Sequence, residues 1–85
     1  MKLVTEQIEK FSAYLHREEK SLATREKYLR DVRTFQTYAG DREVSKELVV
    51  AWKKELISRG YAVRSFNSMI AGVNGLLDFL GLSYC

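Results

Sequence analysis

Residues 61–81 of the chain read YAVRSFNSMIAGVNGLLDFLG. Apolar residues in this stretch recur at steps of three and four, which predicts a helix that begins near Ala62, ends at Gly81 and turns one stripe toward a core. No acidic residue occurs between Glu55 and Asp78, so the opposite face is suited to receive a polyanion. The core stripe holds Phe66, Met69, Ile70, Val73, Leu76, Leu77 and Leu80, and the opposite face holds Arg64, Asn67, Ser68, Ala71, Asn74 and Gly75.

Two glycines, Gly72 and Gly75, lie inside this predicted helix. Each is expected to destabilise a helix interior by roughly 1 kcal/mol relative to alanine. A local rule broken twice indicates a compensating contact, with another helix or with a ligand. The sequence leaves both possibilities open.

The composition indicates one small cytoplasmic domain. The chain has 85 residues, 46% hydrophobic and 29% charged, with no proline and a net charge of +3, which permits nucleic-acid binding without requiring it. A lone cysteine, Cys85, excludes an internal disulfide and a multi-cysteine metal site. No segment resembles a signal peptide or a membrane span, so we expect no membrane partner. We also expect no cofactor and no metal.

Three further helices are predicted upstream. They are expected from Thr5, as N-cap, to about Glu19; from the N-cap Ser21 to Ala39, followed by Gly40; and from the N-cap Ser45 to a stop at Gly60, with Ile57 on the core stripe of this last helix.

A spacing of 41 residues relates the two halves of the chain. Thr24 then matches Ser65, Val32 matches Val73, and Gly40 matches Gly81. Two copies of a helix-turn-helix unit are the simplest description. The sequence therefore predicts an all-α fold, a four-helix orthogonal bundle in which the second and fourth helices are equivalent and present their N-termini on one side.

Hydroxyl, amide and basic side chains occur at the starts of both equivalent helices. Such groups beside free backbone N–H groups suit contact with phosphate, and arginine and asparagine can also read base edges. The alternative is a solvated face on which Arg25, Arg30 and Arg33 pair with Glu26 and Asp31. The candidate DNA-binding residues are Thr24, Arg25 and Lys27 in the first set and Arg64, Ser65, Asn67 and Ser68 in the second.

Catalytic chemistry finds no support in the sequence. A nucleophile needs a neighbouring base or anion-stabilising group, and no such cluster is evident around the tyrosines. The chain also lacks a glycine-rich phosphate loop. We therefore expect no catalytic residues.

The motifs at the two helix starts resemble a known family. Ser21-Leu-Ala-Thr24 followed by Tyr28, and Gly60-Tyr-Ala-Val-Arg-Ser65-Phe-Asn67, are similar to the paired motifs of the N-terminal core-binding, SAM-like domain of phage-type tyrosine recombinases and integrases. The resemblance covers about Thr5 to Leu82. Ala62 departs from the family pattern, which has serine there.

The resemblance implies residues 1–85 as a single DNA-binding domain that clamps duplex DNA for integration and recombination. The implied partners are double-stranded DNA, a C-terminal catalytic domain of the same parent chain and other recombinase protomers. The family's catalytic residues belong to that other domain, so this piece is expected to be no enzyme. The alternative is a SAM-type protein-interaction module in which Ala71, Gly72, Asn74 and Gly75 pack on a partner helix.

Overall fold

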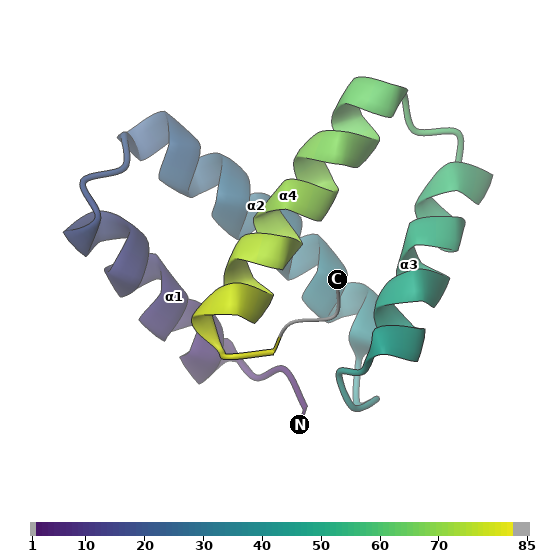
Figure 1. Cartoon of the computed structure of the whole chain (residues 1–85), viewed down its shortest axis with the longest axis horizontal. Coiled ribbons are helices and arrows are strands. Elements are labelled where there is room, and N and C mark those ends of the chain that lie inside the picture. Colours follow the sequence, from purple (N-terminus) through teal and green to yellow (C-terminus); the bar gives the residue numbers. More distant parts are fainter. Residues whose placement is uncertain (1, 83–85) are drawn as a thin grey trace.

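The computed structural model describes residues 2–82, so Tyr84 and Cys85 lie outside the described residues. Four helices make up the fold, and the all-α bundle predicted from the sequence is confirmed. In Figure 1, α1 and α2 form one pair, α3 and α4 form the other, and α4 crosses α2 near the middle of both helices. The helices are α1 (Thr5–Arg17), α2 (Leu22–Ala39), α3 (Lys46–Ser58) and α4 (Val63–Phe79).

Serine caps start the two middle helices as predicted. Ser21 Oγ accepts a hydrogen bond from the Thr24 backbone N–H at 3.2 Å, and Ser45 Oγ accepts one from Leu48 N–H at 3.1 Å. The predicted Thr5 cap is wrong by one residue, because Val4 is the N-cap of α1. There the Gln7 side chain accepts a hydrogen bond from Val4 N–H at 3.0 Å, which is the N3-to-N-cap half of a capping box, while the Val4 side chain makes no cap hydrogen bond.

The helix boundaries confirm the internal repeat. Helices α1 and α3 each have 13 residues, and their first residues, Thr5 and Lys46, lie at the spacing of 41 that also separates Lys27 from Ser68. Equivalent turns share their backbone conformation, since φ is 58° at Glu19 and 79° at Gly60. A left-handed conformation at a non-glycine residue is strained, so the repeat imposes this geometry on Glu19.

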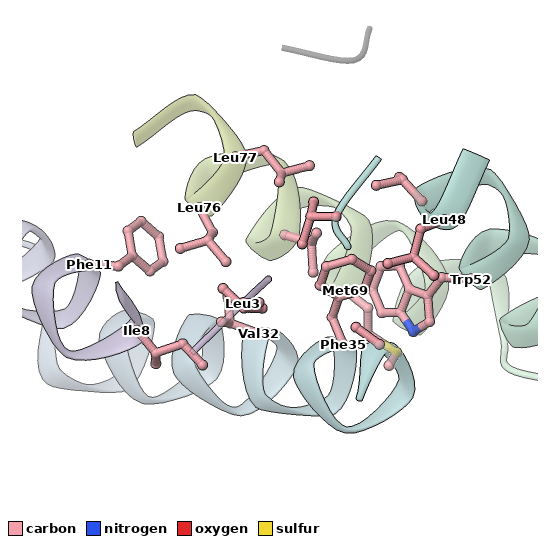
Figure 2. Close-up of a cluster of buried hydrophobic side chains, with 14 of the residues drawn as sticks. Leu3, Ile8, Phe11, Val32, Phe35, Leu48, Trp52, Met69, Leu76 and Leu77 are labelled. Carbon is pink, nitrogen blue, oxygen red and sulfur yellow. The ribbon is translucent and has the colours of Figure 1, made fainter. Parts of the chain in front are cut away.

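The core lies between the two helix pairs. Phe35 of α2 and Trp52 of α3 pack edge to face with ring centroids 5.0 Å apart (Figure 2). The ring centroids of Phe11 of α1 and Phe79 of α4 lie 5.6 Å apart. The prediction that Ile57 is a core residue is wrong. It lies one position past the buried Leu56, and its side chain is 65% exposed.

The close approach of α2 and α4 depends on Gly72. A Cβ at Gly72 would lie 3.3 Å from the Cβ of Asp31, whereas a Cβ at Gly75 would meet only the end of the Phe11 ring at 3.6 Å. Both glycines thus face helices of the same chain. Placing Gly75 on a face turned away from the protein was wrong, because it packs beside α1.

Asp31 is the buried charge at this crossing. The alternative of a solvated face included Asp31 as a partner of surface arginines, but the residue is only 3% exposed because Gly72 of α4 lies against it. Its carboxylate oxygens are shared between two cations of α2, with Oδ2 3.1 Å from Lys27 Nζ and Oδ1 3.5 Å from Arg30 Nε. A buried carboxylate requires such partners, because desolvating an unpaired charge costs several kcal/mol.

Alanine substitutions at the two glycines should change stability in opposite directions. Gly75→Ala is expected to raise the free energy of unfolding by about 0.5–1 kcal/mol, since alanine favours the helix and its methyl group fits. Gly72→Ala is expected to be about 1–3 kcal/mol less stable than Gly75→Ala, because a methyl group at position 72 would press against the Cβ of Asp31 on α2. Urea unfolding followed by circular dichroism measures both. Equal stabilisation of the two variants would show that the crossing is not tight.

Candidate nucleic-acid interface

A surface hollow of about 500 Å³ lies between the N-terminal half of α4 and the middle of α2. Arg64 enters its lining from α4 and Arg30 from α2, and both residues are exposed. Asp31 supplies the only carboxylate among the described residues that line the hollow, and it is buried and already paired with cations. The accessible part of the hollow is therefore basic. The remaining lining residues are Thr34, Tyr61, Ser65, Ser68 and Met69.

The two arginines of the hollow are not repeated in the other half of the chain. The repeat spacing of 41 assigns Ala71 as the equivalent of Arg30 and Ala23 as the equivalent of Arg64. Both arginines are thus replaced by alanine in the other half. The two halves share a backbone, but only one of the two equivalent surfaces carries guanidinium groups.

The N-terminus of α4 differs from that of α2 in its capping. Ala62 is the N-cap of α4 and makes no side-chain hydrogen bond, whereas Ser21 accepts from Thr24 N–H at the start of α2. The first-turn N–H groups of α4 therefore have no capping side chain, and the first turn contains no acidic residue. Such an end can bind an anion through its backbone donors.

Of the second predicted set, three residues gather at the hollow. Arg64, Ser65 and Ser68 line it, while Asn67 is exposed on α4 outside the lining. A guanidinium and hydroxyl groups beside a free helix end can contact phosphate oxygens.

The first predicted set is more dispersed. Thr24 is half-buried, and its hydroxyl oxygen accepts a hydrogen bond from Ser21 Oγ at 2.9 Å. Arg25 does not line the hollow with Arg64; it is half-buried, and its Nε is buried with no partner among the described residues. The repeat explains this position, because Arg25 is the equivalent of Phe66, which packs against the core.

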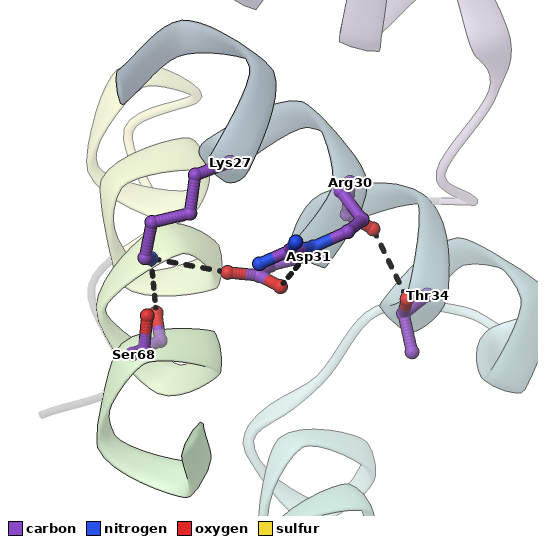
Figure 3. Close-up of polar contacts among 5 residues, drawn as sticks. All are labelled: Lys27, Arg30, Asp31, Thr34 and Ser68. Carbon is purple, nitrogen blue, oxygen red and sulfur yellow. Dashed lines mark hydrogen bonds and ion pairs between the residues drawn. The ribbon is translucent and has the colours of Figure 1, made fainter. Parts of the chain in front are cut away.

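Lys27 joins the two helices. Its ammonium donates to Asp31 Oδ2 and to the backbone carbonyl oxygen of Ser68 on α4, each at 3.1 Å (Figure 3). It lies about 160° around α2 from Arg25, because successive residues of a helix are about 100° apart. The two basic residues of the first set therefore occupy different flanks of α2.

Arg30 is the residue of the hollow that the candidate set omitted. Arg30 was part of the solvated-face alternative, and its side chain is 72% exposed. A signal for its position was present in the sequence, since Arg30 follows Lys27 by three residues and Thr34 follows Arg30 by four, which places them on one flank of the helix.

Two other findings concern sites of a different kind. Within residues 2–82, no helix is both long and apolar enough to cross a membrane. In the same range, no three His, Cys, Asp or Glu side chains are grouped so that they could hold a metal ion.

Comparison with known proteins gives one match. The family described as the phage integrase N-terminal SAM-like domain matches residues 8–82, which is most of the chain. Neither the curated proteins nor the solved structures contain a significant match. The match agrees with the resemblance drawn from the motifs at Ser21 and Ser65 and with the four-helix fold. The chain belongs to the family of phage-integrase N-terminal SAM-like domains.

Proposed function

We propose that this domain binds double-stranded DNA as the non-catalytic arm of a tyrosine recombinase or integrase, on the side of the bundle where α4 begins. The observation that carries the proposal is the pairing of Arg30 and Arg64 around one hollow whose only carboxylate is buried. Two guanidinium groups from different helices can hold neighbouring phosphates, while the uncapped end of α4 adds backbone donors.

The proposed contact surface is centred on α4. Arg64, Ser65 and Ser68 would contact the DNA backbone together with Arg30, and the exposed amide of Asn67 would reach toward base edges. Thr24 and Arg25 would lie at the margin of this surface, near the start of α2. In Figure 1 the helices α2 and α4 both begin at the upper edge, which allows one duplex to pass both starts.

The rest of the proposed assembly follows from the family. A catalytic domain of the same parent chain would close on the opposite side of the duplex, and other protomers would occupy neighbouring sites on the DNA. The domain itself would contribute binding and no chemistry.

Part of the surface that a protein-interaction module would need is buried within this fold. It requires Gly72 and Gly75 to pack against a partner helix, yet Gly72 is buried against α2 and Gly75 is half-buried against α1. Of that set only Ala71 is exposed, and Asn74 is half-buried. We therefore favour DNA as the partner.

Duplex binding by the 85-residue chain should weaken steeply as salt rises. Each phosphate contact contributes about −0.9 to the slope of log K against log salt, so two to four contacts predict a slope of roughly −2 to −4. Fluorescence anisotropy of a short labelled duplex, titrated at several salt concentrations, measures this slope. Absence of binding at low salt, or a slope near zero, would remove the proposal.

Single arginine substitutions should locate the surface. Arg30→Ala and Arg64→Ala are each expected to weaken binding and to reduce the salt slope by about 0.9, because each removes one phosphate contact. Arg64 is exposed, so Arg64→Ala should change urea unfolding little. Arg30→Ala also removes one of the two cations beside the buried Asp31 and should lower the free energy of unfolding, so binding is measured at a temperature where each variant is folded. Lys54→Ala, which removes a cation from the outer face of α3, is the control and should leave the slope unchanged. Equal effects of all three variants would mean that binding follows net charge alone.

A further inference from the structure

We infer that Lys27 is a positioning residue: it holds the two DNA-facing helices at a fixed separation and does not itself contact phosphate. This inference rests on the proposed function. It departs from the assignment of Lys27 to the contact set, which was made from its place in the first turns of α2.

The hydrogen bonds of Lys27 are directed into the protein. An ammonium has three N–H donors, and two of them are taken by Asp31 Oδ2 and the Ser68 carbonyl oxygen at 3.1 Å each. The nitrogen also lies 5.1 Å from the centroid of the Tyr28 ring. Its side chain is 35% exposed, compared with 72% for Arg30. One N–H of the ammonium remains for any other partner. A phosphate that displaced Asp31 would leave carboxylate oxygen Oδ2 without its cation in a side chain that is only 4% exposed.

Gly72 makes this contact with α4 possible. In a helix, the Gly72 N–H bonds the Ser68 carbonyl, and a side chain at position 72 would crowd the space around that oxygen. A Cβ at Gly72 would lie 3.7 Å from Asp31 Oδ2, the same oxygen that accepts from Lys27. Because Gly72 has no side chain, the Asp31 carboxylate, the Lys27 ammonium and the Ser68 carbonyl oxygen can lie next to one another.

The contact also connects to both arginines of the hollow. Asp31 Oδ1 lies 3.5 Å from Arg30 Nε, so the same carboxylate that holds Lys27 restrains Arg30. Ser68 lies one helical turn after Arg64, so the bond from Lys27 fixes the part of α4 from which Arg64 projects. Figure 3 shows this chain of contacts running from Ser68 through Lys27 and Asp31 to Arg30. Breaking it should let the two guanidinium groups lose their mutual spacing.

The test is a double substitution that preserves net charge, Lys27→Met with Asp31→Asn. Because one positive and one negative charge are removed, the net charge stays at +3. The matched control is Glu6→Gln with Lys10→Met, which removes another i,i+4 ion pair, at 3.4 Å and largely exposed on α1. Duplex affinity and salt slope are measured for both variants and the unsubstituted chain, at a temperature where circular dichroism shows each to be folded.

A positioning role predicts a several-fold loss of affinity with an unchanged salt slope for the Lys27/Asp31 variant, and no change for the control. A slope reduced by about 0.9 would show instead that Lys27 contacts a phosphate, which overturns the inference while leaving the proposed function standing. Unchanged affinity would overturn it as well. Failure of the unsubstituted chain to bind at low salt would contradict both the proposed function and this inference. The proposed function is therefore tested by the unsubstituted chain, and the role of Lys27 by the variants. If the double variant does not fold, Lys27→Arg takes its place with different readings. A several-fold loss of affinity supports a positioning role, because a guanidinium has a different reach and shape between Asp31 and Ser68. Unchanged or tighter binding overturns it, because arginine contacts phosphate at least as well as lysine.

Discussion

The close approach of α2 and α4, where Asp31 meets Gly72, is the constraint on which the rest of the structure depends. Gly72 lacks a side chain and so lets the helices come together, and their contact buries a carboxylate that must then be neutralised. Lys27 supplies that neutralisation and bonds α4 at the same time. The basic hollow lies beside this crossing, between α2 and α4.

The internal repeat explains why the fold could be predicted and why the site could be predicted only in part. Helical periodicity and the caps at Ser21 and Ser45 depend on neighbours in the sequence, and the repeat at a spacing of 41 residues can be read by comparing the two halves of the chain. The burial of Asp31 depends on a glycine 41 positions away. No local pattern contains that information, so Asp31 was grouped with the charged residues of the solvated-face alternative.

The candidate site shows the same division. Arg64, Ser65 and Ser68 could be grouped from the sequence because they share the first turns of one helix, and the structure places them at one hollow. The spacing of Lys27, Arg30 and Thr34 places Arg30 on the same flank of α2 as Lys27, but the sequence did not show that this flank faces α4. Arg25 was grouped with Arg64 because each lies near a helix start, yet its equivalence to Phe66 places it beside the core. The position of each residue along its helix could be predicted from the sequence, but the element that its side chain faces could not.

The missing cap at Ala62 has a consequence for the dynamics of α4. A helix end whose first amides lack a capping side chain frays more readily than one held by serine, so its amide hydrogens exchange faster with solvent. A phosphate seated there would act as the absent cap. Binding of the phosphate and ordering of the first turn of α4 would then occur together. The conformational entropy lost in ordering this turn would lower the affinity of the domain for the phosphate.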